Sequence, residues 1–255
     1  MLYILGLGLR GVSSLSLQEK DILSRCEHIF FETYTSVSPS QTIDQLSSML
    51  NREVKRAGRE EVENPVALLS LASRNDVCLL VTGDPLSATT HNQLRVDAHL
   101  AGINVEVIEN ASILSVIPGK LGLFPYRMGP PVSLPFPEDN FLPRSVCQKI
   151  KFNQDSGFQT MVLLDLREGR TMYSFEAVDV LRGWYDKRYR RLFKFKVENV
   201  FRTVPYYLLP ILRHFYCSTY HAVSADGTNR VFLLHPQQNI HSLKGIHCSA
   251  FSQVK

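Results

Sequence analysis

The chain has 255 residues, of which 44% are hydrophobic and 20% are charged, and its formal net charge is +4. This composition is typical of a globular protein with enough apolar side chains to build a core, which excludes a mainly disordered chain. No apolar stretch approaches the roughly 20 residues that a membrane-spanning helix needs, so we expect no membrane protein. The five cysteines form no C-x-x-C pair. We therefore expect free thiols and a cytoplasmic location.

The first half of the chain alternates short apolar runs with amphipathic helical patterns. Ser16 and Glu19 have the spacing of a helix-capping box at the start of the first helix. The patterns predict strands at 2–5, 28–31, 76–82 and 105–108, and helices at 16–26, 41–50, 65–71 and 89–100. This β-α-β-α rhythm predicts a parallel sheet with helices on both faces.

The second half of the chain has a different character. Six prolines between residues 118 and 137 predict a crossover or linker over residues 112–143. A buried strand is predicted at 160–166 and a helix at 173–184. We expect two α/β domains, residues 1–112 and 113–255. From residue 182 to 202 the chain carries eight basic and two acidic residues, which indicates a solvated face or a contact with an acidic partner.

A glycine motif follows the first predicted strand. Gly6, Gly8 and Gly11 match G-x-G-x-x-G, and Glu32 ends the next strand 21 positions after Gly11. This is the pattern of a dinucleotide-binding fingerprint, which would indicate an NAD-dependent oxidoreductase. In that fingerprint the helix starts within the glycines, whereas the capping signal at Ser16 starts it five residues later. A tight turn between strand and loop is the alternative interpretation.

Polar residues also follow two other predicted strands. Asp84 lies in a Gly-Asp-Pro turn, and Ser112 comes shortly after the strand at 105–108. The carboxyl ends of parallel strands are where α/β proteins bind ligands. Asp84 can accept hydrogen bonds from a ligand or from its own backbone. Ser112 can face a ligand or, more simply, cap the following helix.

Seven motifs together resemble one known family. They are G-L-G-L from Gly6, E-x-Y-T-S from Glu32, R-E-x-V-E from Arg59, G-D-P-L-x-A-T-T-H from Gly83, N-A-S-I from Asn110, G-L-x-x-Y-x-x-G from Gly122 and L-L-D-L from Leu163. Their order and spacing resemble the diphthine synthases, S-adenosylmethionine-dependent methyltransferases that are related to the tetrapyrrole methylases. The resemblance covers about residues 1 to 180.

The resemblance implies a two-domain α/β fold with the methyl donor in the cleft between the domains. It also implies a homodimer and methylation of the modified histidine of translation elongation factor 2, in diphthamide biosynthesis. It implies no metal, no direct contact with nucleic acid and no particular catalytic side chain. Asp84 would be the polar anchor of the donor and Leu9 would pack on it. By matching motif, the donor contacts would be Leu9, Asp84, Ser87, Ser112, Ile113 and Leu164.

The C-terminal third departs from the family pattern. The family's A-R-x-G and P-x-H-x-L motifs have only faint matches at residues 221–226 and 239–243. By that alignment Ser224 and His241 would complete the donor site. Because residues 180–255 match poorly, a homologue that binds donor or elongation factor without turnover is kept as an alternative. The H-x2-C-x3-H spacing from His214 to His221 is not expected to hold zinc.

Overall fold

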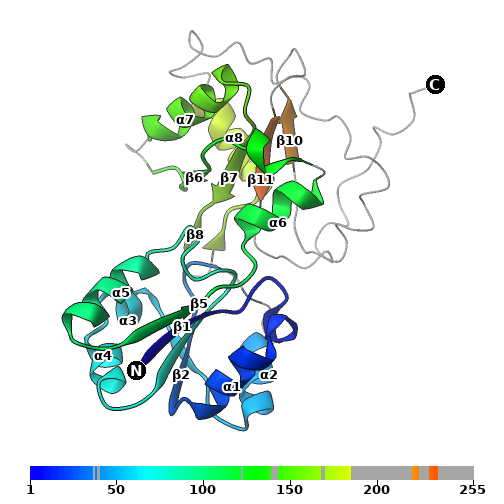
Figure 1. The fold of residues 1–255 in the computed structure, drawn as a ribbon. Helices are drawn as coiled ribbons and strands as arrows, with labels where there is room; N and C mark the ends of the chain where they lie inside the picture. The colour runs from blue at the N-terminus through cyan, green and yellow to red at the C-terminus, as the bar shows by residue number, and fades with distance from the viewer. Residues whose placement is uncertain are drawn as a thin grey trace.

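The computed structural model describes residues 1–36, 38, 41–121, 123–138, 143–167, 170–184, 220–223 and 230–234. Two larger sheets organise most of these residues, one built from the N-terminal part of the chain and one from later residues. Figure 1 shows the first sheet in the lower part of the molecule and the second in the upper part. Among the described residues, none of the helices has the length and apolar character of a membrane span.

The first sheet has five parallel strands in the order β3-β2-β4-β1-β5. Every residue of the two central strands, β1 and β4, is buried. Strands covered on both faces need such continuous apolar runs, which explains the prediction of these two strands from sequence. The strands are β1 (Leu2–Gly6), β2 (His28–Glu32), β3 (Lys55–Ala57), β4 (Val77–Val81) and β5 (Val105–Ile108).

Helices cover both faces of this sheet, as predicted. Helices α1 (Leu17–Arg25) and α2 (Thr42–Leu50) pack on the face that contains Leu5 of β1. On the opposite face, which contains Ile4, lie the three helices α3 (Arg59–Glu63), α4 (Val66–Ala72) and α5 (His91–Leu100). Alternate residues of β1 therefore enter two different cores.

The start of α1 is set locally by its capping box. The Ser16 side chain accepts a hydrogen bond from the Glu19 amide at 3.2 Å, and the Glu19 carboxylate accepts one from the Ser16 amide. A short 3-10 turn, η1 (Gly11–Ser14), separates the glycine loop from the helix. The predicted helix start is confirmed, and so is the gap between the glycines and the helix.

The second sheet has the order β10-β11-β7-β6, and β7 is parallel to both of its neighbours. Its strands are β6 (Val132–Leu134), β7 (Thr160–Leu164), β10 (Tyr220–Val223) and β11 (Arg230–Leu234). Helices α7 (Arg144–Asp155) and α8 (Ser174–Trp184) pack on the face that contains Leu164. Helix α6 (Ile113–Lys120) packs on the other face, against Met161 and Leu163.

Two expectations for the second half need correction. The region 112–143 is not simply a linker, because it holds α6, the 3-10 turn η2 (Pro125–Arg127) and β6. Helix α6 contains Pro118, which is buried together with Ile117 and cannot donate a hydrogen bond to the Leu114 carbonyl. The strand predicted over 160–166 is interrupted at Asp165, whose carboxylate accepts a hydrogen bond from the Phe136 amide at 2.8 Å. A two-residue strand, β8 (Leu166–Arg167), follows and pairs with β9 (Arg170–Thr171).

Candidate functional site

The carboxyl ends of β4, β1 and β5, which are neighbours in the first sheet, meet at one edge. The connection after β1 leads to α1 on one face of the sheet, whereas the connection after β4 leads to α5 on the other face. Adjacent strands whose connections diverge in this way leave a crevice, and α/β proteins bind ligands there. This edge is therefore the candidate site.

Direct hydrogen bonds join the three loops that follow these strands. The Gly8 amide donates to the Gly83 carbonyl at 3.0 Å, and the Gly83 amide donates to the Gly8 carbonyl at 2.9 Å. Asn110 Nδ2 donates to the Gly6 carbonyl and to Glu19 Oε1, both at 2.9 Å. A Cβ on Gly6 would lie 2.6 Å from the Gly83 carbonyl oxygen, so this close approach requires glycine. We call these joined loops, residues 6–9, 83–87 and 110–112, the three-loop clasp.

Asp84 is half-buried and stabilises the turn in which it lies. Its Oδ1 accepts hydrogen bonds from the Leu86 amide at 3.0 Å and from Ser87 Oγ at 2.8 Å. Among the described residues, its Oδ2 receives a single long bond, at 3.4 Å, from the Asn110 amide. The turn-forming role considered from sequence is thus present. Because each carboxylate oxygen can accept two hydrogen bonds, Oδ2 keeps the capacity to bind a ligand donor.

Gly83 opens a small space in the clasp. Its φ is +82°, and a Cβ built there would approach only Leu9 Cδ2 and the Ala111 carbonyl oxygen, each at 3.9 Å. The absent side chain therefore leaves a cradle about the size of one methyl group, between the Leu9 side chain and the Ala111 carbonyl oxygen. Asp84 lies at the next position along the chain. These features suit a ligand that has both a polar donor group and an apolar or aromatic part.

Ser112 caps α6, as expected from sequence. Its Oγ accepts a hydrogen bond from the Leu114 amide at 3.2 Å, and its side chain is almost fully buried. Ile113 is the first residue of the helix and packs with the cluster that contains Met161 and Leu163 of β7. Because α6 starts at the clasp and packs on β7, it links the candidate site directly to the second sheet.

The remaining predicted contacts are less closely associated with the clasp. The Leu164 side chain points into the core beneath α7 and α8, on the face opposite Leu163. A donor contact from Leu164 stays a prediction. Ser224 and His241 lie outside the described residues. The structure thus brings Leu9, Asp84, Ser87, Ser112 and Ile113 to one edge of the first sheet.

The glycine motif does not have the geometry of a dinucleotide fingerprint. Glu32, which would bind a ribose in that interpretation, is fully buried. Its carboxylate accepts hydrogen bonds from the Tyr34 amide, the Thr35 amide at 2.6 Å and Thr35 Oγ1 at 2.5 Å. The N-terminus of α1 is closed by its own capping box. Glu32 therefore holds the E-x-Y-T-S turn, and the basis for an NAD-dependent oxidoreductase is lost.

A polar cluster that the sequence patterns did not indicate lies beside the clasp. Tyr34 Oη is 3.1 Å from Thr90 Oγ1, and the Arg59 guanidinium lies 4.9 Å from the centre of the Tyr34 ring. Burial raises the pKa of the Tyr34 hydroxyl above its usual value. The His91 and Tyr34 rings pack in a T-shaped arrangement, with centroids 6.3 Å apart. These residues come from three motifs that are far apart in the sequence. The only sequence signal that could have suggested their proximity is that all three motifs resemble the same family.

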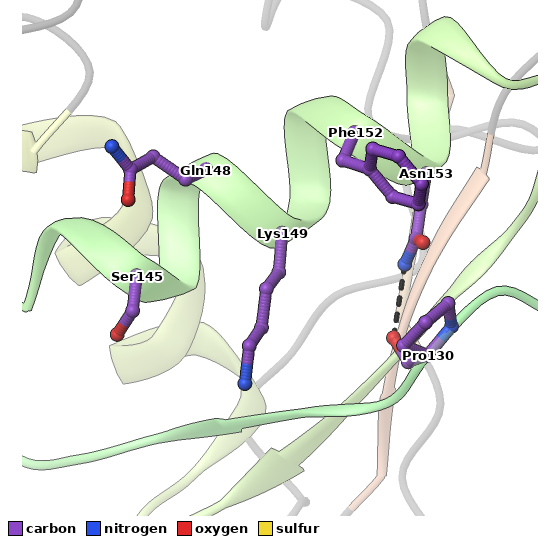
Figure 2. Close-up of a pocket in the computed structure, with 6 residues that line it drawn as sticks. All are labelled: Pro130, Ser145, Gln148, Lys149, Phe152 and Asn153. Carbon is purple, nitrogen blue, oxygen red and sulfur yellow. Dashed lines mark hydrogen bonds between the residues drawn. The ribbon is translucent and has the colours of Figure 1, made fainter.

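Two other features carry no chemistry in the described part of the chain. No group of three or more histidine, cysteine or acidic side chains there is arranged to hold a metal. The His214 and Cys217 positions lie outside it. A hollow of about 290 Å³ lies against α7 (Figure 2), where Asn153 Nδ2 donates to the Pro130 carbonyl at 2.9 Å. Its lining residues are Pro130, Ser145, Gln148, Lys149, Phe152 and Asn153.

The fold defines an α/β protein whose three-loop clasp lies where the parallel strands of the first sheet end. The model of the Tetrapyrrole (Corrin/Porphyrin) Methylases matches residues 1–186, and the chain belongs to this family. Within the family, the curated relatives place it among the diphthine synthases.

The diphthine synthase of Thermoplasma acidophilum is 46% identical over 178 residues, which cover 70% of this chain and 69% of that protein. The diphthine methyl ester synthase of Saccharomyces cerevisiae is 38% identical over 168 residues, covering 66% of this chain and 56% of that protein. A crystal structure of diphthine synthase has a TM-score of 0.69 and 23% identity, and the match covers 97% of this chain and 85% of that one. At this identity the structural match shows the shared fold.

Proposed function

We propose that this chain is an S-adenosylmethionine-dependent methyltransferase that methylates the modified histidine of translation elongation factor 2 in diphthamide biosynthesis. The observation that carries the proposal is membership of a methylase family together with relatives named diphthine synthase and diphthine methyl ester synthase. The clasp supports it because its loops follow the carboxyl ends of neighbouring parallel strands, where α/β proteins bind ligands.

The proposed donor site is the three-loop clasp. Asp84 Oδ2 has acceptor capacity for an amino or hydroxyl group, and the missing side chain at Gly83 lets a ligand approach the backbone beside Leu9. Leu9 lies beside Gly83 and Ser87 donates to Asp84, and we propose Ser112 and Ile113, at the start of α6, as further donor contacts. We keep Leu164, Ser224 and His241 as further proposed contacts, and we propose that the domains divide at residue 112, with the donor between them.

Methyl transfer places modest chemical demands on the side chains. S-adenosylmethionine supplies a methyl group that is already activated on a positively charged sulfur. The protein mainly has to align the acceptor with that group and to keep water away. The clasp suits this role because its loops are fixed by their own hydrogen bonds before any ligand arrives.

We also propose that the chain is a cytoplasmic homodimer. The location is supported by the free thiols of Cys26, Cys78 and Cys147, all buried and unpaired as disulfides. The dimer follows from the resemblance to the diphthine synthases. Sedimentation analysis of the purified chain tests the dimer.

Calorimetric titration of the full chain with S-adenosylmethionine and, separately, with NAD tests the proposed function. We expect micromolar binding of the methyl donor and none of NAD. Transfer of a labelled methyl group to elongation factor 2 that carries the unmethylated intermediate then tests turnover. A folded chain that binds no donor contradicts the proposal, whereas donor binding without turnover favours the non-catalytic binding homologue.

A further inference from the structure

The loop between β4 and α5 is held by its own side chains along its whole length. At its start, Asp84 Oδ1 accepts hydrogen bonds from the Leu86 amide and Ser87 Oγ. Two side chains at its end bond back to the Pro85 carbonyl oxygen. Thr89 Oγ1 donates to it at 2.6 Å, and His91 Nδ1 lies 3.0 Å from it. The Pro85 carbonyl is therefore the point where the end of the loop is tied back to its beginning.

The partner of His91 determines where the imidazole carries its hydrogen. A carbonyl oxygen can only accept a hydrogen bond, so Nδ1 must be the donor. His91 is fully buried, and its Nε2 has no hydrogen-bond partner among the described residues. An unpartnered buried nitrogen is unfavourable, and an apolar side chain would fill the same space without that penalty. Packing alone therefore does not account for a histidine here, whereas the bond to Pro85 does.

The backbone between the two ends of this loop is strained. Ala88 has a φ of +60°, in the left-handed region that residues other than glycine rarely adopt. Such a conformation persists only where the surroundings enforce it. Thr89 is the next residue after Ala88 and His91 lies three positions after it, and both side chains bond back to the carbonyl of Pro85, three positions before it. These two bonds hold the loop on a path that its backbone would not adopt by itself.

We propose that His91 is a positioning residue for the methyl donor, which it orients through the Pro85 carbonyl and hence through Asp84. The inference rests on the proposed function, because the clasp must first be the donor site. Pro85 also contacts the β1 end of the clasp, since its Cδ lies 2.9 Å from the position that a Cβ on Gly6 would take. A donor that binds a preformed loop loses less free energy to ordering than one that must organise it. His91 thus raises donor affinity without touching the donor.

Two amide substitutions separate the positioning role from simple packing. In His91→Asn, the amide nitrogen falls near the place of Nδ1 and can still donate to Pro85. In His91→Gln, the amide reaches the place of Nε2 and that bond is lost. His99→Gln is the matched control, because His99 is exposed on the same helix. Each full-length variant is titrated with S-adenosylmethionine, and hydrogen exchange is followed at the Leu86 and Ser87 amides without donor.

We expect His91→Asn to bind the donor within about twofold of the unaltered chain, and His91→Gln to bind it about tenfold more weakly. Exchange at the two loop amides should rise in His91→Gln only. Both variants replace a buried ring, so a purely structural role would affect them alike in melting temperature and affinity. Equal affinities for the two variants refute the inference. If the unaltered chain binds no donor but the exchange pattern is as expected, the proposed function is contradicted and the bond only constrains the loop.

Discussion

The substitution Asp84→Asn separates the roles of the two carboxylate oxygens of Asp84. Oδ1 holds the turn, and Oδ2 is the proposed acceptor for the ligand. The amide oxygen can take the place of Oδ1 and keep the bonds from the Leu86 amide and Ser87 Oγ. The amide NH2 then replaces Oδ2, so it can no longer accept a hydrogen bond from the donor. The new NH2 group also faces the Asn110 backbone amide, and because both groups are donors, no hydrogen bond can form between them.

The structure sets the size of the two effects. Within the described part of the chain, the substitution removes a single bond to Oδ2, the 3.4 Å bond from Asn110, so the free energy of unfolding should fall by less than about 1 kcal/mol. A hydrogen bond from the ligand to a charged acceptor contributes about 1.5–3 kcal/mol, which corresponds to a Kd about 10-fold to 150-fold weaker for S-adenosylmethionine. Asp84→Ala should in addition destabilise the fold by about 1–3 kcal/mol, because the turn loses its acceptors.

Calorimetric titration and urea unfolding of the same preparations measure both quantities. Asp21→Asn is the matched control, since Asp21 is exposed on α1 and its only ion pair is the surface pair with Arg25 among the described residues. Donor binding by Asp84→Asn that equals that of the unaltered chain refutes the assignment of Oδ2 to the donor. A loss of stability as large as that of Asp84→Ala shows instead that the turn depends on both oxygens.

Three further outcomes follow from the described residues. Gly83→Ala places a Cβ in the cradle at a φ of +82°, so it should lower the free energy of unfolding in urea by about 1–2 kcal/mol. It should also weaken donor binding, measured by titration, by more than about tenfold. Unchanged binding would show that the donor does not use the cradle. Ala88→Gly relieves the left-handed strain and should raise the free energy of unfolding by about 0.5–1 kcal/mol, whereas a loss would mean that the strain is absent. Burial raises the pKa of the Cys147 thiol to about 11, so the unfolded chain loses this proton first and stability falls as the pH rises from about 9 to about 11. Without this thiol, Cys147→Ala should lose up to about 2–3 kcal/mol less of its free energy of unfolding between about pH 9 and about pH 11, as measured by urea unfolding at several pH values. The same dependence of stability on pH in both proteins would contradict the raised pKa.

Local patterns predicted those parts of the fold whose structure depends on nearby residues. The strands β1, β4 and β5 are apolar runs placed within two residues of their observed bounds, and α1 begins at the capping box of Ser16 and Glu19. Each of these signals acts over a few residues, so it is visible without the rest of the molecule. Strand β3 was not predicted, because its Lys55 and Arg56 are exposed and it is a strand only by pairing with β2.

The sequence by itself thus determined the parallel sheet, the loops at its carboxyl edge and the family resemblance. Only the tertiary structure decided which atoms meet in those loops. Asn110 bonds to Gly6, which lies 104 positions away, and Glu32 turns out to bind its own turn rather than face a ligand. The bond between His91 and Pro85 also depends on the path of the whole loop. Hydrogen bonds of this kind require distances set by strand order and packing, which residue spacing alone does not specify.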